Sequence, residues 1–304
     1  MRLKKYLLIF FYLPCYRQEV VSPINQILCT LRFFATGSQL VTCGDMIGIH
    51  ESTACRIVHR VTVAIAALYR TYIKMPDRQA EQNKTATDFY NVARFPRVIG
   101  AIDCTHVKIN SPGGEDAEIF RNRKGYFSIN VQAICSANLL FTDVVARWQG
   151  SAHDSTIWDN SNQKRKFLQR CYGDKLLLGD SGYAQMPFMM TPLSSVSTRA
   201  ESLYNESQIR TRNCIERAFG VWKRRFPILS RGIQVQLRRI PAIIIATAVL
   251  HNIALLQGDT VPQEDPEYPS VEEQFQESAA NEQTNNNGRQ ARQELIEQFF
   301  ASLG

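Results

Sequence analysis

Three acidic residues have the types and spacing of metal ligands in a nuclease. Asp103 ends the apolar run 98–102, and Asp180 ends the apolar run 176–179. Glu216 lies in an amphipathic segment that predicts a helix. An ionised carboxylate beside a buried strand is costly unless something binds it. Two carboxylates from strands and one from a helix therefore predict a site for divalent metal ions.

The chemistry of such a site follows from its ligands. Hard divalent cations such as Mg²⁺ or Mn²⁺ take oxygen ligands and are held by a few carboxylates, water and substrate phosphate. Two ions about 3.5–4 Å apart can activate a water and stabilise the leaving oxygen of a phosphodiester. Asp103, on the central strand, is the candidate to bridge both ions. Asp180 and Glu216 would each hold one ion, and no other cofactor is needed.

Each of the three residues also has an ordinary structural explanation. Asp180 could shape the turn that follows its strand. Glu216 could pair on a helix surface with Arg212, four residues earlier. Asp103 could accept hydrogen bonds from backbone amides. The three acids together, in one order of strands, favour the metal site.

The hydrophobic pattern predicts an α/β core around these acids. Strands are expected at 97–109, 127–135, 139–148 and 174–180, with helices at 153–170, 204–226 and 241–256. The second and third strands form a hairpin. This order is typical of a ribonuclease-H-like catalytic core, a mixed sheet flanked by helices. Its first and fourth strands are neighbours, so Asp103 should lie near Asp180, with Glu216 on the next helix.

A small helical domain is predicted before this core, at residues 22–75. Ser22, followed by proline, can start a helix. Gly48 suits the tight turn of a helix-turn-helix, whose second helix would carry Arg56 and Arg60 toward DNA. Plain packing of helices explains the same pattern equally well, so both interpretations remain open.

Charge is distributed unevenly along the chain. Residues 259–304 contain ten acidic and two basic side chains, so a chain of net charge +7 carries +15 on the preceding residues. That excess suggests a polyanion as partner, most simply nucleic acid, although an ordinary solvated cationic face is the alternative. Besides Arg56 and Arg60, the candidate DNA contacts are Lys124, Arg212, Arg217, Lys223 and Arg224.

The remaining segments complete the predicted domain organisation. Residues 1–21 form an atypical N-terminal segment, 76–96 a polar linker bounded by prolines, and 97–257 the nuclease domain. Residues 258–304 are acidic and rich in Gln and Asn, which predicts disorder. Near the end, Leu295, Ile296, Phe299 and Phe300 could form a short helix that docks on the protein.

Several classes of protein are disfavoured. The first thirteen residues imitate a signal peptide, but no small-residue cleavage site follows, so secretion is not expected. No apolar stretch approaches the length needed to span a membrane, and no membrane partner is expected. The eight cysteines contain no C-x-x-C pair, and no two histidines have zinc-ligand spacing. Reduced thiols are the expectation.

Other polar residues are weaker candidates. His153 and Asp154 predict a helix cap, with direct catalysis as the alternative. His106 could orient the site or simply be packed. His251 and Asn252, on the apolar segment 241–256, predict a hydrogen-bonded core pair rather than metal ligands.

Seven short motifs, in order, carry a resemblance to a known family. They are Ile-Asp-Cys-Thr-His at 102–106, Asn-Arg-Lys-Gly at 122–125, the segment 150–155, Leu-Gly-Asp-Ser-Gly-Tyr at 178–183, Thr-Pro-Leu at 191–193, Ile-Glu-Arg-Ala-Phe-Gly at 215–220 and Val-Leu-His-Asn at 249–252. Over roughly residues 22–257 the chain resembles the PIF/Harbinger DDE transposases and the nucleases derived from them.

The resemblance implies a ribonuclease-H-like catalytic domain preceded by a helix-turn-helix, divalent metal and DNA as substrate. The family's acidic triad falls on Asp103, Asp180 and Glu216. It also implies action in the nucleus, with protein in the cytoplasm too, often with a separate Myb-like partner that binds DNA and aids nuclear import. A homo-oligomer stays open. The first twenty residues depart from the family's usual longer, helical N-terminus.

Two functions compete. The first is a metal-dependent DNA nuclease of transposase origin, in which water attacks a phosphodiester and leaves a 3′-hydroxyl. The alternative is a catalytically silent, domesticated DNA-binding or adaptor protein that keeps the fold. The intact acidic triad favours the enzyme.

Overall fold

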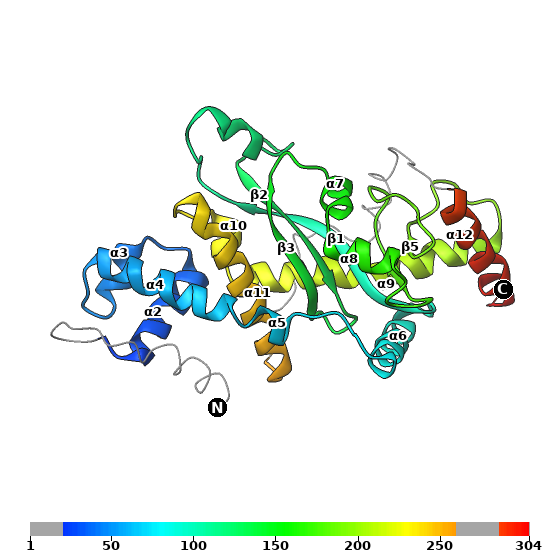
Figure 1. The fold of residues 1–304 in the computed structure, drawn as a ribbon, viewed down its shortest axis with the longest axis horizontal. Coiled ribbons are helices and arrows are strands. Elements are labelled where there is room, and N and C mark those ends of the chain that lie inside the picture. The colour runs from blue at the N-terminus through cyan, green and yellow to red at the C-terminus, as the bar shows by residue number, and fades with distance from the viewer. Residues whose placement is uncertain (1–20, 260–285, 304) are drawn as a thin grey trace.

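A mixed five-stranded sheet forms the centre of the molecule, in a computed structural model that describes residues 21–259 and 286–303 (Figure 1). The strands lie in the order β3-β2-β1-β4-β5. Their bounds are β1 Val98–Lys108, β2 Ser128–Cys135, β3 Phe141–Gln149, β4 Leu176–Leu178 and β5 Met189–Met190. Central β1 is antiparallel to β2 and parallel to β4, which is the arrangement expected of a ribonuclease-H-like core.

The register of β1 and β4 decides where the two aspartates lie. Ala101 is the partner of Leu178 in the parallel pair. Asp103 and Asp180 each follow these partners by two residues, so Asp180, just after β4, lies beside Asp103 in the middle of β1. The predicted neighbourhood of the first and fourth strands is confirmed.

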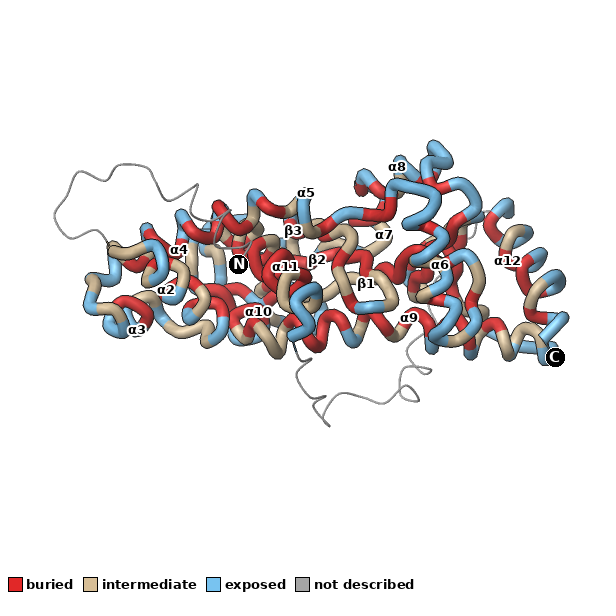
Figure 2. The backbone as a smooth tube through the Cα atoms, turned by 90° about the horizontal axis from the view of Figure 1, so that it is seen from below, coloured by how far each residue is buried: buried red, intermediate tan, exposed pale blue. Residues whose placement is uncertain are grey.

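Helices cover both faces of the sheet, and Figure 2 shows much of the centre of the molecule in the colour of buried residues. The long helix α9, Arg199–Arg225, and the apolar helix α11, Ile240–Leu256, pack with Ala101 on one face. Ile102 belongs to a second cluster, on the other face, with residues of α7 and α8. Because side chains alternate along a strand, Asp103 faces α9.

The other elements are short or lie at the periphery. Two helices, α7 Asp154–Asp159 and α8 Asn162–Leu168, replace the single helix predicted at 153–170, because the Ser161 side chain caps α8 by accepting from the amide of Lys164. The remaining short elements are α5 Tyr69–Tyr72, η1 Glu115–Phe120, α10 Ile228–Arg231 and η2 Leu237–Arg239.

Helix α9 begins five residues earlier than predicted. A capping box starts it: the Thr198 side chain accepts from the amide of Glu201, whose carboxylate accepts from the amide of Thr198. Polar residues fill the first turn, so the apolar pattern alone misses it. The result is a helix of 27 residues that is long enough to carry both Arg212 and Glu216 past β1.

Three N-terminal helices form one end of the molecule: α2 Pro23–Thr36, α3 Leu40–Asp45 and α4 Glu51–Ala66. Ser22 caps α2 as predicted, accepting from the amide of Asn25. Gly48 has a φ of +69° in the turn between α3 and α4, which a residue with a side chain rarely adopts. Helix α4 also packs against α11, so this region shares a hydrophobic core with the sheet.

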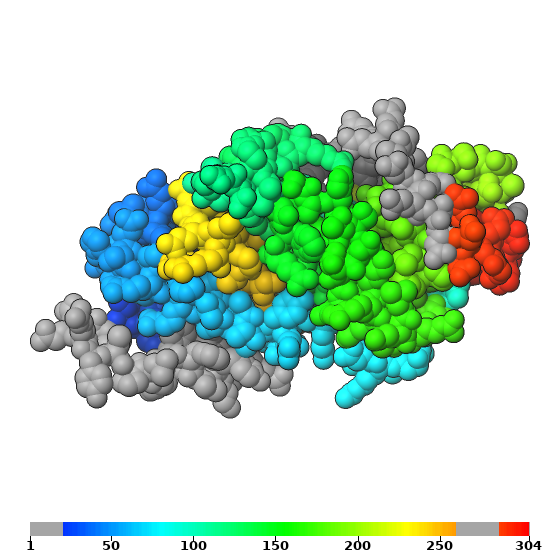
Figure 3. Space-filling model, turned by 45° about the horizontal axis from the view of Figure 1, so that its top comes forward, coloured from blue at the N-terminus to red at the C-terminus, as the bar shows by residue number. Residues whose placement is uncertain are grey.

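Two predictions about connecting segments are wrong. Residues 76–96 are not a linker, because α6, Gln79–Ala93, buries Phe89 and Gln82 against β1 and α9. Most residues of α6 are polar and exposed, so the hydrophobic pattern of the sequence did not indicate its narrow buried face. The tail is not wholly disordered either: α12, Asn286–Gln298, and η4, Phe300–Leu303, form the opposite end of the molecule (Figure 3).

The predicted terminal helix is confirmed by its buried side chains, Leu295, Ile296 and Phe300. Arg292 of α12 donates to the carbonyl of Thr191, close to β5. The atypical N-terminal segment predicted at 1–21 falls, apart from Val21, outside the described residues, as does the acidic stretch 260–285.

One helix is long and apolar enough to cross a membrane, Leu237–Leu256, by length and composition alone. The sequence-based statement that no stretch approaches this length is therefore wrong. In the fold, this segment includes α11, a core helix packed against α4, α5, β3 and α9. The expected core pair is confirmed: His251 bonds the carbonyl of Leu139, and Asn252 bonds both backbone groups of Phe141.

Candidate active site

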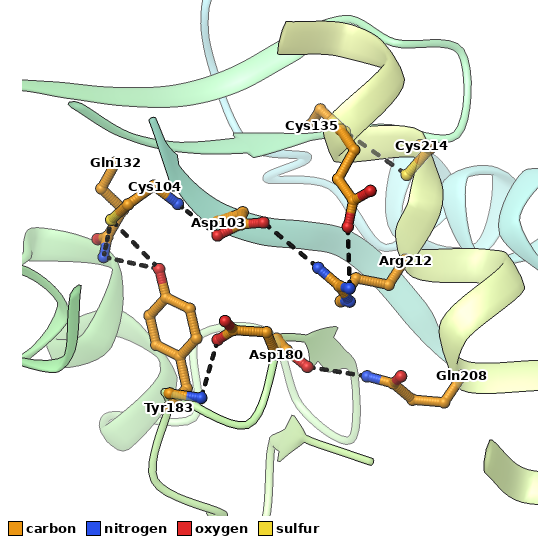
Figure 4. Close-up of polar contacts among 12 residues, drawn as sticks. Asp103, Cys104, Gln132, Cys135, Asp180, Tyr183, Gln208, Arg212 and Cys214 are labelled. Carbon is orange, nitrogen blue, oxygen red and sulfur yellow. Dashed lines mark hydrogen bonds and ion pairs between the residues drawn. The ribbon is translucent and has the colours of Figure 1, made fainter. Parts of the chain in front are cut away.

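The three predicted acids converge where β1, the segment after β4 and α9 meet. Figure 4 shows the guanidinium of Arg212 joined to Asp103 by a dashed line, with Asp180 below Asp103 on the same side of the guanidinium. Arg212 Nη1 lies 3.3 Å from Asp103 Oδ2, and Arg212 Nη2 lies 2.9 Å from Glu216 Oε1. One guanidinium thus joins two of the acids directly and lies beside the third.

Burial makes this cluster electrostatically unusual. The side chains of Arg212, Asp103 and Glu216 are 11%, 17% and 26% exposed. Burial, and then the charge of Asp180, raise the pKa of Asp103 well above its ordinary value, while Arg212 and the amide of Cys104 oppose the rise. Negative charge is therefore concentrated in a region where water stabilises it poorly.

Asp180 is held by the turn that follows it. Its Oδ1 accepts from the amide of Gly182 at 3.0 Å. Burial raises the pKa of Asp180, Arg212 lowers it, and Asp154 raises it again. A side chain at Gly179 would lie 2.9 Å from the ring of Tyr183, so glycine is needed just before the aspartate. Gln208 of α9 donates to the carbonyl of Gly179 at 2.8 Å, which ties α9 to this turn.

A neutral polar network on the opposite face of β1 supports the aspartates. Cys104, directly after Asp103, lies with its Sγ 3.5 Å from the hydroxyl of Tyr183. Gln132 of β2 donates to that hydroxyl at 3.3 Å and to the sulfur of Cys104 at 3.8 Å. The network connects the residues that follow both catalytic candidates, and sequence reasoning did not find it. The alternation of Asn130 and Gln132 on a buried strand was the available signal.

Asp154 does not cap α7, contrary to the sequence-based expectation. The N-cap position is His153, which makes no side-chain cap hydrogen bond. Asp154 Oδ1 instead accepts from Asn130 Nδ2 at 2.9 Å, because the short α7 starts directly over β2. Its charge affects the pKa values of Asp103, Asp180 and Cys104, so it is a fourth acid near the site.

The donor set fits a hard divalent cation. Three carboxylates supply only oxygen, and burial leaves their negative charge poorly compensated by one guanidinium. Within residues 21–259 and 286–303, no three His, Cys, Asp or Glu side chains are already close enough together to hold a metal ion. The cluster is centred on Arg212 instead.

Basic candidates fall into separate groups. Arg212 was predicted to contact DNA, but its side chain is buried among the acids and is not exposed to a DNA backbone. The spacing of residues along the helix did not show which way this side chain faces. Lys223 Nζ donates to Thr105 Oγ1 and to the carbonyl of His106 at 2.7 and 3.0 Å. Burial and then nearby Lys124 lower its pKa to about 8. These two lysines lie near the C-terminal end of β1.

His106 lies between this cationic flank and Asp154. Its Nδ1 is 3.0 Å from Ser128 Oγ, and burial lowers its pKa. Of the other basic candidates, Arg217 is exposed on α9, Arg224 is half-buried near its end, and Arg56 and Arg60 are exposed on α4. Arg60 also donates to Gln26 of α2. The structure thus gathers Lys124 and Lys223 near the acids and leaves the α4 arginines at the far end.

Comparison with known proteins agrees with this geometry. Residues 102–252, which include all three acids, match the family model described as DDE superfamily endonuclease. The human protein "Putative nuclease HARBI1" is 34% identical over 269 residues, covering 86% of this chain and 77% of its own length. The Mus musculus protein of that name is 34% identical over 296 residues, covering 95% and 83%. The Arabidopsis thaliana protein ALP1-like is 26% identical over 261 residues, covering 80% and 63%.

No solved structure matches the chain. The site and the family model define a DDE-type endonuclease domain. At this level of identity and coverage, the chain belongs to the PIF/Harbinger family of DDE transposases and is a nuclease of transposase origin, similar to HARBI1.

Proposed function

We propose that this chain is a divalent-metal-dependent DNA nuclease that hydrolyses phosphodiester bonds. The observation that carries the proposal is the convergence of Asp103, Asp180 and Glu216 around Arg212, where β4 ends beside the middle of β1. Such a concentration of buried carboxylates is costly to a protein without a cationic ligand.

Asp103, Asp180 and Glu216 would hold two Mg²⁺ or Mn²⁺ ions. When bound, such ions provide an acidified water and stabilise the charge of the leaving oxygen. The chain itself contributes position: β1 and the Gly182 turn fix the aspartates, and the hydroxyl of Tyr183 braces Cys104 behind them. Lys223 and Lys124 would bind the DNA backbone beside the acids.

The helices α3 and α4 would form a second DNA contact as a helix-turn-helix, with Arg56 and Arg60 exposed on its second helix. DNA as substrate implies action in the nucleus, with cytoplasmic protein before import. A Myb-like partner protein and self-association are part of the same proposal. The tight turn at Gly48 supports the helix-turn-helix.

Nicking of supercoiled plasmid tests the proposal. Wild-type protein should nick DNA with Mg²⁺ or Mn²⁺ and lose this activity in EDTA and in Asp103→Asn. The matched control is Asp159→Asn, which removes an exposed carboxylate of α7 that pairs with Lys164 and should nick normally. A folded wild-type protein that shifts DNA on a gel but never cuts it would favour the adaptor alternative and refute the nuclease.

A further inference from the structure

Arg212 places its positive charge among the three acids. Its guanidinium reaches Asp103 on β1 and Glu216 one turn further along α9, and its charge lowers the pKa of Asp180. Ionised, three carboxylates and one guanidinium carry a net charge of −2. A single divalent cation would neutralise that remainder.

The guanidinium is removed from water and held by both of its ends. Its side chain is 11% exposed, and the attraction of the acids outweighs burial, so the pKa of Arg212 lies above its ordinary value. A planar guanidinium can bond two carboxylates at once, which the ammonium of lysine does less well. This geometry brings a strand and a helix into one cluster with no metal ion present.

We propose that Arg212 is a positioning residue of the acidic triad: it holds Asp103 and Glu216 together in the metal-free protein and competes with the divalent cation for their oxygens. The inference rests on the proposed function, since it concerns how the same site receives its metal. An inner-sphere cation needs lone pairs of Asp103 and Glu216 that Arg212 now uses. Two cations at such short range also repel each other strongly in a poorly hydrated site.

Metal binding measured by calorimetry tests the competition. Titration with MnCl₂ should show tighter binding to Arg212→Gln than to wild type, by about tenfold or more, because one local positive charge is lost. Arg212→Lys keeps the charge but loses the planar guanidinium that bonds two carboxylates, so its affinity for Mn²⁺ should lie between those of wild type and Arg212→Gln. The control Arg210→Gln removes an exposed arginine of the same helix and should bind Mn²⁺ as wild type does.

The sign of the change distinguishes competition from a merely structural role. If Arg212 only braced the fold, its loss would loosen the site and weaken Mn²⁺ binding. Equal or weaker binding in folded Arg212→Gln, or in Arg212→Lys where the glutamine variant does not fold, would overturn the inference.

Thermal unfolding in EDTA provides a readout that needs no metal and no arginine variant. Neutralising one acid of an uncompensated cluster relieves repulsion and raises the melting temperature. If Arg212 holds the cluster together, Asp103→Asn should instead lower it by about 5 °C, since a partner of a buried ion pair is lost. Asp159→Asn, at an exposed pair, should change it by about 2 °C or less.

A rise in melting temperature for Asp103→Asn would overturn the inference. Wild-type protein that binds no Mn²⁺ at millimolar concentration would refute the proposed function and the competition. A lowered melting temperature of Asp103→Asn in EDTA would still establish Arg212 as the residue that assembles the triad.

Discussion

Two buried polar clusters lie against the same sheet, and they differ in whether their groups carry charge. Around Asn252, every contact is neutral: its side chain bonds the amide and carbonyl of Phe141 and the carbonyl of Tyr72. Around Arg212, three acids share one guanidinium, whose Nε has no hydrogen-bond partner within the described part of the chain. The first cluster carries no charge that a ligand must compensate, and the second carries more negative than positive groups.

This difference teaches how to separate structure from function in a core. A neutral, hydrogen-bonded cluster stabilises the fold, and its loss should lower stability whether or not metal is present. A charged, under-compensated cluster costs stability relative to a neutral one, although removing one partner of its ion pairs costs more, and it is retained for what it binds. Mutations at the two clusters should therefore affect different measurements.

The largest expected effect is on activity at the charged cluster. Glu216→Gln should reduce nicking about a thousandfold, because a lost metal ligand removes several kcal/mol of stabilisation of the transition state. Its free energy of unfolding should fall by only about 1 kcal/mol, since the amide oxygen can still accept from Arg212. Plasmid-nicking rates and urea unfolding measure the two quantities. If Glu216→Gln lost stability but kept its nicking activity, the Arg212 cluster would be structural and not catalytic.

The neutral cluster should respond in the opposite way. Asn252→Ala leaves two backbone groups of Phe141 and the carbonyl of Tyr72 without their partner, at a cost of about 3 kcal/mol in the free energy of unfolding. Binding of Mn²⁺ to the folded variant should be unchanged. Asn160→Ala, at an exposed asparagine whose side chain donates to the carbonyl of Thr156 in its own helix, is the control for urea unfolding. If the free energy of unfolding fell by less than about 1 kcal/mol, water would be bonding the backbone groups that Asn252 bonds in wild type.

The sequence was sufficient for much of this comparison. Apolar runs that end in an acid predicted strands β1 and β4, and the strand order then made Asp103 and Asp180 neighbours. Asp103 lies in the middle of β1 and not at its tip, because the strand continues to Lys108. The apolar helix with His251 and Asn252 was also predictable as a core pair. Both inferences rely on local periodicity, which a sequence displays directly.

Other features of the fold and the site depend on tertiary contacts, which the periodicity of the sequence does not reveal. Arg212 and Glu216 at i and i+4 are compatible with an exposed pair or a buried bridge, and only the approach of β1 decides between them. The buried face of α6 is narrow, and β5 has two residues, too few for any period. The local sequence around Asp154 is that of a helix cap. Its actual bond partner, Asn130, lies 24 residues earlier, so the local pattern could not reveal it.

The last comparison is a pH dependence of stability at the neutral cluster, where His251 packs beside Asn252. His251 Nε2 lies 3.0 Å from the carbonyl of Leu139, so that nitrogen carries the proton and donates it. Burial lowers the pKa of His251 from 6.5 to about 4, although the bond to Leu139 opposes this shift. Between these values the unfolded chain binds more protons than the folded one, so stability should fall as the pH falls from about 6.5 to about 4.

His251→Gln removes this titration and keeps a donor for the carbonyl of Leu139. Burial raises the pKa values of Asp103 and Asp180, and these groups contribute a pH dependence of opposite sign in wild type and variant alike. The difference in unfolding free energy between the two proteins isolates the histidine. It should shift by about 3 kcal/mol in favour of the variant between pH 7 and pH 4. A difference independent of pH would mean that the neutral cluster admits a charged histidine, and the contrast with the Arg212 cluster would fail.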